Sequence, residues 1–243
     1  MDRAGAQGQT VAEVLRPERC ERHRLARGSQ IAFRYVAPLL RLYFDVRIQR
    51  PRDLLSTPAG TRLIFAPTHQ SILDPWLLMG AFDHHEWRRV APIRALATQS
   101  FEGGFLARAL PLVKLLYRIS GVVVLPPRGH GLVALEAKVR GLIDALDCGE
   151  EVVIFPEGRI RKEAQPPVGQ FAPGVVHVHR RAGAPVVPIA VWTGRGPGLR
   201  TRYSVRVGAP LHIPPELSLA AGAAWLRDRT VELYRAAERD GER

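Results

Sequence analysis

The sequence predicts an α/β fold in which helices flank a mainly parallel, twisted sheet, preceded by an N-terminal amphipathic helical segment. Short, wholly apolar runs typical of buried strands alternate along the chain with longer segments of helical spacing. The 243 residues are 46% hydrophobic, which is enough for one domain with a sizeable core. Residues 31–48 carry a narrow polar stripe on an otherwise apolar helical wheel, which predicts the N-terminal segment.

The N-terminal segment, residues 1–52, is basic, with eleven arginines against five acidic residues. In its second half, Arg34, Arg41 and Asp45 fall on one side of the helix expected over residues 31–48. A helix of this kind either packs its wide apolar face on a core or lies in a membrane interface, and both readings stay open. We therefore divide the chain into this segment and one domain over residues 53–243.

Strands and helices alternate through the second part of the chain. Buried strands are expected over residues 61–67, 94–98, 121–127, 150–158, 185–193 and 202–213. Helices are expected over residues 75–82, 131–147, 173–182 and 218–239. In open α/β sheets, binding sites form beyond the carboxyl ends of the strands. Polar residues that follow the strands 61–67 and 150–158 are therefore the first candidates for chemistry.

The charge of the chain points to an anionic partner. The formal net charge is +12 and the isoelectric point is about 10.8. Such a balance suits a nucleic acid, an anionic membrane surface or a phosphorylated substrate. The sequence has no zinc-ligand spacing, no aromatic RNA-recognition signature and no basic coiled-coil region, so we expect no nucleic-acid partner.

The cysteines and the remaining histidines give no sign of a metal. Cys20 and Cys148 have no CxxC spacing, which favours a reducing compartment over a disulfide framework. His84 and His85, and likewise His177 and His179, lack partners at metal-ligand spacing. The first thirty residues are polar and arginine-rich, and no uninterrupted apolar run reaches the roughly 20 residues of a membrane span. We therefore expect neither a signal peptide nor a membrane span.

The stretch FAPTHQSILDPWLL places His69 in a strand-to-helix turn five residues before Asp74. An aspartate directly before a proline is a good helix N-cap, which explains Asp74 but not His69. A turn of this length can also let Asp74 accept one imidazole N–H, so that the other ring nitrogen acts as a base. Because the chain has no GxSxG turn, such a pair would activate a hydroxyl of a bound substrate, which predicts group transfer.

Two further clusters follow predicted strands. In VVIFPEGRIRK, residues 152–162, Glu157 and Gly158 form a tight turn, and Arg159 is the first of several cations after it. Arg128 follows the apolar run GVVVLPP, where a guanidinium could bind phosphate through two hydrogen bonds. Loop arginines are more often simply solvated, so Arg128 alone is weak evidence. For Glu157 and Gly158, the position at the carboxyl end of a strand favours a functional role.

Four segments together resemble a known family. THQSILD, GVVVLPPR, FPEG and VVPIAV occur in the order, and at about the spacing, of the four motif blocks of glycerolipid acyltransferases. The chain resembles the lysophosphatidate (1-acylglycerol-3-phosphate) O-acyltransferase group over about residues 60–193. The resemblance implies that His69 is the general base, that Asp74 orients it and that Arg128 binds the phosphate of the acceptor.

The same resemblance implies that Glu157 and Gly158 shape the acceptor pocket and that Arg159 adds a phosphate contact. The implied reaction moves a fatty acyl group from acyl-CoA or acyl-carrier protein to a lysophospholipid, most simply lysophosphatidic acid, with no cofactor and no metal. We expect the protein to be held peripherally on the cytoplasmic face of the cell membrane. The arginine-rich residues 1–52 would be attracted to the anionic membrane surface, and the amphipathic helix would insert its apolar side.

The chain departs from the family pattern near the expected phosphate site. Thr68 stands where the family has asparagine, and Pro127 stands where an acidic residue usually precedes the arginine. FAPG, residues 171–174, lacks the lysine often found there. These changes leave other acceptors open, namely a lyso-ornithine lipid, another lysophospholipid or glycerol 3-phosphate. The remaining alternative is a lipid-binding protein without turnover, against which the intact pair of His69 and Asp74 argues.

Overall fold

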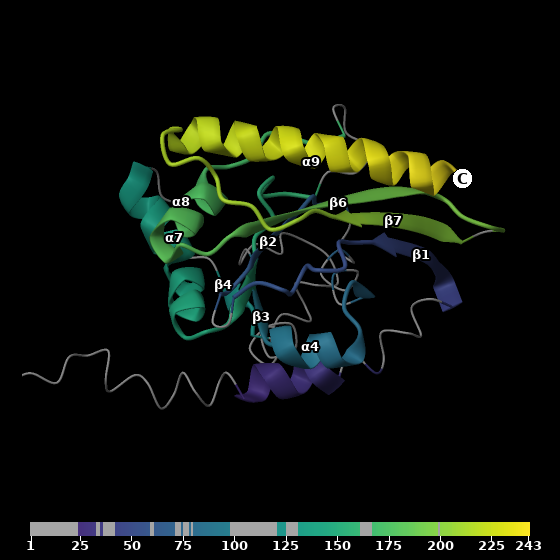
Figure 1. The fold of residues 1–243 in the computed structure, drawn as a ribbon, viewed down its shortest axis with the longest axis horizontal. Coiled ribbons are helices and arrows are strands. Elements are labelled where there is room, and N and C mark those ends of the chain that lie inside the picture. Colours follow the sequence, from purple (N-terminus) through teal and green to yellow (C-terminus); the bar gives the residue numbers. More distant parts are fainter. Residues whose placement is uncertain are drawn as a thin grey trace, which may run out of the picture.

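The computed structural model describes residues 24–32, 35, 42–58, 61–70, 74, 78, 80–97, 121–124, 131–160, 167–198 and 200–243. Its strands form one seven-stranded sheet in the order β1–β7–β6–β2–β5–β3–β4 (Figure 1). They span Phe44–Gln49 (β1), Ile64–Pro67 (β2), Ile93–Ala97 (β3), Val123–Val124 (β4), Glu151–Val153 (β5), Val186–Arg195 (β6) and Thr201–Val207 (β7). Every strand expected from the sequence is present in this sheet, which confirms the α/β prediction.

Most of the sheet is parallel. β2 pairs in parallel with both β5 and β6, and β3 pairs in parallel with both β5 and β4. The exception is β7, which is antiparallel to β6 because only residues 196–200 separate them, too few for a crossover connection. β1 then pairs in parallel with β7. The carboxyl ends of β2, β5 and β6 therefore lie at one edge of the sheet.

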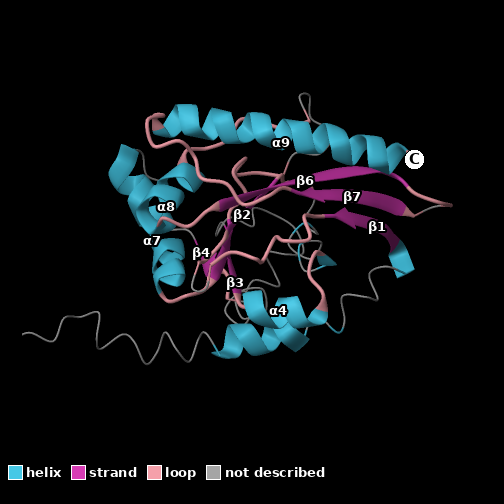
Figure 2. Ribbon diagram, viewed as in Figure 1, coloured by secondary structure: helices cyan, strands magenta, loops and turns pink. Residues whose placement is uncertain are grey.

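Helices cover both faces of the sheet (Figure 2). On one face lie α7 (Gly131–Asp147), α8 (Gly174–Ala182) and α9 (Leu219–Glu242), and on the other lies α4 (His84–Val90). Because side chains alternate along a strand, each face has its own core. The first core includes Ile64, Val152 and Val186 of the sheet with Leu142, Val175 and Leu226 of the helices. The second includes Phe65, Val187 and Val205 of the sheet with Leu54, Phe82 and Trp87.

Residues 24–32 are helical and pack beside α4 (Figure 1). The buried side chain of Gln30 accepts a hydrogen bond from the Ile93 N–H and donates one to the Ile93 carbonyl, each at 2.9 Å. The Gln30 carbonyl accepts a third bond from Trp87 Nε1 at 3.2 Å. The first two bonds dock the helix on the start of β3, and the third docks it on α4. Among the described residues, no helix combines the length and the apolarity that a membrane crossing needs.

The helix predicted over residues 31–48 is wrong for residues 44–48, which belong to β1. Phe44, Val46 and Ile48 alternate with polar residues, and all three pack against the second core. The polar side of the strand is also used, since Asp45 accepts a hydrogen bond from Arg202 of β7 at 2.6 Å. The stretch fits a period of two as well as a helical one, and pairing with β7 selects the strand. The division of the chain at residue 52 stays a prediction, although β1 belongs to the sheet.

Candidate active site

The turn after β2 brings His69 and Asp74 into contact. His69 Nδ1 lies 2.9 Å from Asp74 Oδ2, and the same oxygen accepts a hydrogen bond from the Gln70 N–H at 2.7 Å. The Asp74 side chain is fully buried, whereas 18% of the His69 side chain is exposed. Because a carboxylate only accepts, Nδ1 carries the hydrogen, and Nε2 is left as the basic nitrogen. Within the described part of the chain, Nε2 has no hydrogen-bond partner.

Thr68 fixes the point at which the chain leaves the sheet. It is fully buried, its N–H donates to the Ile189 carbonyl and its hydroxyl accepts from the Val191 N–H, each at 2.9 Å. The hydroxyl thus takes the place of a backbone acceptor and extends the pairing of β2 with β6 by one residue. This contact gives the threonine, which departs from the family pattern, a clear structural role directly before His69.

Phe155 forms a wall of the site. Its ring stacks on the imidazole of His69, with the ring centroids 4.1 Å apart and an angle of 27° between the planes. Phe155 follows β5, and the preceding residue is tied to β2 by a bond of 2.9 Å from the Ile154 N–H to the Phe65 carbonyl. The two motif segments therefore meet because their strands are neighbours, as we expected from the sequence.

The turn after Phe155 holds the other candidate residues. Gly158 has a φ of 67°, in the left-handed region that favours glycine, and it is exposed together with Arg159. Glu157 Oε1 accepts a hydrogen bond from the Gly169 N–H at 2.9 Å. The carboxylate thus supports the backbone of a neighbouring loop. The substrate-binding roles of Glu157, Gly158 and Arg159 stay predictions, and Arg128 lies outside the described residues.

A contribution from α9 was not predicted from the sequence. Tyr234 of α9 is buried, and burial raises the pKa of its phenol to about 12, with smaller contributions from the negative charges of Glu238 and Glu157. Gly169 connects α9 to the FPEG turn, because its N–H donates to Glu157 and its carbonyl accepts from Arg227 of α9. No sequence motif marks the helix as part of the site, because its residues approach only through the fold.

His177 and His179 have structural partners. His177 of α8 contacts Glu136 of α7. His179 Nδ1 bonds to the Ala184 carbonyl at 2.8 Å, and the Ile213 N–H donates to His179 Nε2 at 3.2 Å. In the described ranges, no three His, Cys, Asp or Glu side chains are grouped so that they could hold a metal ion.

The motif segments and the fold that carries them have counterparts in known proteins. A family model described as "Acyltransferase" matches residues 46–192, which is more than half of the chain. The chain belongs to the acyltransferase family. The match covers His69, Asp74 and the FPEG turn, and it ends within β6, before β7 and α9. The protein is therefore an acyltransferase, and the family suggested by its four motif segments is confirmed.

The fold of this acyltransferase is similar to a crystal structure of the 1-acyl-sn-glycerophosphate (LPA) acyltransferase PlsC from Thermotoga maritima. The TM-score is 0.54 and the sequence identity 17%, over 96% of this chain and 84% of that chain. At this identity the likeness concerns the fold alone. No curated protein sequence matches the chain.

Proposed function

We propose that the protein transfers a fatty acyl group from acyl-CoA or acyl-carrier protein to the hydroxyl of lysophosphatidic acid, giving phosphatidic acid. The observation that carries the proposal is the 2.9 Å contact between His69 Nδ1 and Asp74 Oδ2, which leaves Nε2 as a base. The chain has no GxSxG turn that would supply a serine nucleophile, so the base acts on a substrate hydroxyl. The choice of acceptor is supported by the similarity in fold to an LPA acyltransferase.

In this mechanism His69 Nε2 takes the proton of the acceptor hydroxyl while the oxygen attacks the thioester carbonyl. Asp74 stabilises the imidazolium that forms, and Phe155 keeps the ring in its plane. The tetrahedral intermediate then expels the thiolate, which receives the proton from His69. Arg128 and Arg159 would bind the acceptor phosphate, with Glu157 and Gly158 shaping the pocket.

The test is thiol release from acyl-CoA by the purified protein, measured with and without lysophosphatidic acid. We expect release that requires the lysolipid and is about 10² to 10⁴-fold slower in the His69→Ala variant, because the base is then missing. Lysophosphatidic acid is wrong as the acceptor if thiol appears only with glycerol 3-phosphate, a lyso-ornithine lipid or another lysophospholipid. If the protein binds lipid but releases no thiol from acyl-CoA or acyl-carrier protein with any of these acceptors, the result would instead support a lipid-binding protein without turnover.

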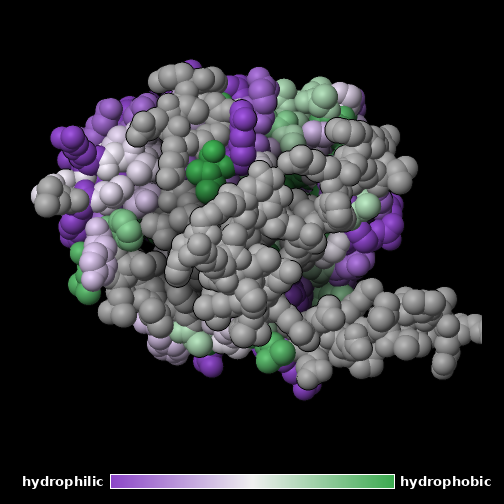
Figure 3. All heavy atoms as spheres, turned by 180° about the vertical axis from the view of Figure 1, so that it is seen from behind, coloured by the Kyte–Doolittle hydropathy of each residue, from purple (hydrophilic) through white to green (hydrophobic). Residues whose placement is uncertain are grey.

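We also propose that the enzyme works peripherally on the cytoplasmic face of the cell membrane. The net charge of +12 favours an anionic surface. Four large apolar side chains near the N-terminus, which are between 58% and 72% exposed, could insert between lipids: Leu25, Tyr35, Leu42 and Tyr43. On the face in Figure 3, hydrophobic side chains of described residues lie scattered among hydrophilic ones. Charge and a few apolar anchors would therefore act together.

Sedimentation with liposomes tests this location. We expect the protein to pellet with anionic liposomes in low salt, because each basic residue near such a surface contributes about 1 kcal/mol. High salt should release much of it, since the surface charges are then screened. The Leu42→Asp variant should pellet less, because a carboxylate replaces an exposed apolar side chain. No pelleting, or equal pelleting with zwitterionic liposomes, would contradict the membrane proposal and leave acyl transfer unaffected.

A further inference from the structure

Residues 167–169, which we call the strap, connect the two motif turns to α9. Val168 and Gly169 are buried, and Pro167 is half-buried. The strap is neither helix nor strand, so the backbone ladders of the sheet do not fix its position. Side chains from other parts of the chain supply its hydrogen bonds instead.

One of these side chains belongs to the turn after β2, which carries His69. Gln70 Nε2 donates to the Pro167 carbonyl at 3.0 Å, across 97 residues of sequence. The backbone N–H of the same Gln70 donates to Asp74 Oδ2, the oxygen that also contacts His69. Gln70 therefore links the strap directly to the pair that carries the base. On the next motif turn, Glu157 Oε1 accepts from the Gly169 N–H.

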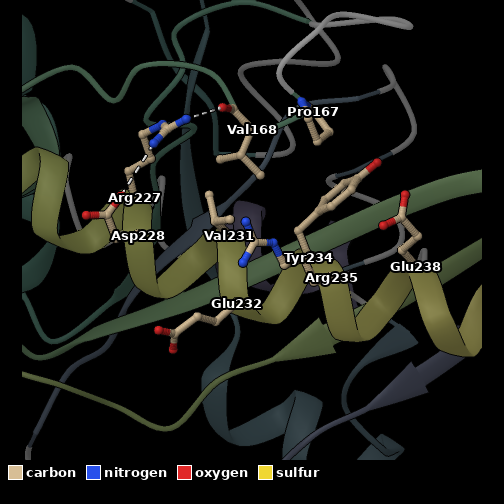
Figure 4. Close-up of a pocket in the computed structure, with 9 residues that line it drawn as sticks. All are labelled: Pro167, Val168, Arg227, Asp228, Val231, Glu232, Tyr234, Arg235 and Glu238. Carbon is tan, nitrogen blue, oxygen red and sulfur yellow. Dashed lines mark hydrogen bonds and ion pairs between the residues drawn. The ribbon is translucent and has the colours of Figure 1, made fainter.

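Arg227 of α9 holds the strap from the other side. Its Nε donates to the Gly169 carbonyl at 2.9 Å. Its Nη2 donates to the Val168 carbonyl at 3.1 Å, the bond drawn in Figure 4. The planar fork of a guanidinium can reach two successive carbonyls in this way, whereas the single ammonium of a lysine lacks that geometry. Together with Gln70, Arg227 provides a hydrogen bond to each of the three carbonyls of the strap.

Arg227 also lines a groove along α9, in which an arginine could bind an anionic ligand (Figure 4). Its donors are directed elsewhere. Nε and Nη2 are occupied by the strap, and Nη1 lies 3.4 Å from Asp228 of the same helix. The side chain is largely buried, with 21% of it exposed. These contacts indicate that Arg227 holds the strap rather than binding a ligand in the groove.

We propose that Arg227 is a positioning residue for acyl transfer. By holding the strap, it fixes Gln70, and through Gln70 the carboxylate that orients His69. It supports Glu157 through the same backbone. The inference rests on the proposed role of His69 and Asp74 in acyl transfer. It also goes beyond the family motifs, because Arg227 lies outside the matched residues 46–192.

The first test compares Arg227→Met with Arg229→Met. Both variants remove one positive charge from α9, but the described contact of Arg229 is with the Trp225 ring, 5.0 Å from its centroid. We expect Arg227→Met to lower kcat about 10- to 100-fold, since a displacement of about 1 Å at a reacting group can cost that much. The KM for the lysolipid should stay close to that of Arg229→Met. The unfolding midpoint should fall, because two strap carbonyls lose their hydrogen bonds, but the variant should remain folded at the assay temperature. Equal kcat values in the two variants, or a loss that only follows unfolding, would overturn the inference.

A double-mutant cycle with Gln70→Ala tests the route through the strap. If Arg227 acts through Gln70, the double variant should have nearly the same kcat as the more impaired single variant. If the fold-losses in kcat of the two single variants multiply in the double variant, the two side chains act independently and the proposal is contradicted. The cycle uses the thiol-release assay with whichever acceptor the wild-type enzyme accepts.

Hydrogen exchange separates this inference from the proposed function, because it needs no substrate. The Gln70 and Gly169 amides donate to Asp74 and Glu157, respectively. Both should exchange faster in Arg227→Met than in Arg229→Met, as read by mass spectrometry of the peptides that contain them. Unchanged exchange would refute the positioning role even if acyl transfer is confirmed. Faster exchange would support it even if lysophosphatidic acid proves to be the wrong acceptor.

Discussion

His69→Ala should lower kcat/KM for acyl transfer by about 10² to 10⁴-fold, the usual contribution of a positioned general base. The imidazole is the basic group that the turn after β2 presents, and its Nδ1 is engaged by Asp74 at 2.9 Å. Without it, the acceptor hydroxyl must lose its proton to water. Thiol release from acyl-CoA, followed at acceptor concentrations well below KM, measures the effect. His85→Ala, which removes an exposed histidine of α4, is the matched control and should retain full activity.

Asp74→Asn should cause a smaller loss, about 10² to 10³-fold, for a reason specific to this turn. Asp74 Oδ2 receives two N–H groups, one from His69 and one from the Gln70 backbone. An asparagine must present its carbonyl oxygen to both, because its NH₂ group would face two donors. The hydrogen therefore stays on Nδ1, and the enzyme loses only the negative charge that stabilises the imidazolium.

Nitrogen-15 NMR of the imidazole distinguishes this explanation from a change of tautomer. Nδ1 should remain the protonated nitrogen in Asp74→Asn, as it is in the wild-type enzyme. A hydrogen that moved to Nε2, together with a loss near 10⁴-fold, would mean that the Gln70 amide does not control the orientation of residue 74. Asp147→Asn, at an exposed carboxylate, is the control for the charge change.

Arg94→Met should lower the free energy of unfolding by about 3 to 5 kcal/mol, the usual cost of removing one partner of a buried ion pair. Arg94 Nε lies 2.5 Å from Glu150 Oε2, and Nη2 lies 2.8 Å from Glu150 Oε1. Only 13% of the arginine side chain and 4% of the glutamate side chain are exposed. The substitution leaves the Glu150 carboxylate buried without this guanidinium. Urea unfolding of the variant and the wild type measures the difference.

Two variants control this measurement. Arg140→Met removes an exposed arginine whose contact with Glu136 is 3.4 Å long, and it should cost less than about 0.5 kcal/mol. Adding Glu150→Leu to Arg94→Met removes the buried carboxylate as well and should recover part of the stability. A loss from Arg94→Met no larger than that from Arg140→Met would show that the buried pair does not stabilise the fold.

The sequence predicts the fold well where the hydrophobic pattern fits only one kind of secondary structure. The continuous apolar runs LIFAP, VVIFP and VVPIAVW mark β2, β5 and β6, and α7 spans Gly131–Asp147, the residues expected from helical spacing. The prediction failed at residues 44–48, where a period of two and a helical period both fit and pairing with β7 decides. It also missed α4, a helix of seven residues whose signal is the capping box formed by Asp83 and Glu86.

In the candidate site, contacts between residues close in sequence could be predicted, whereas contacts between distant residues could not. The contact of His69 with Asp74 is local, so the spacing of five residues and the turn chemistry were enough to predict it. The Phe155 ring on His69 could be anticipated only as far as β2 and β5 were expected to end together. Arg227 reaches the strap across 58 and 59 residues of sequence, and no local pattern in α9 encodes such a contact.

α9 also changes what counts as a complete catalytic unit. Near its carboxyl end, the Asp240 carbonyl accepts from Arg47 of β1, and the Gly241 carbonyl accepts from Arg202 of β7. Nearer the amino end of the helix, Arg227 donates hydrogen bonds to the strap. A fragment trimmed to the family match would lose α9, which covers part of one sheet face, together with the hydrogen bonds that Arg227 donates to the strap. Chimeric enzymes that exchange motif blocks between relatives should therefore take the blocks and α9 from the same parent.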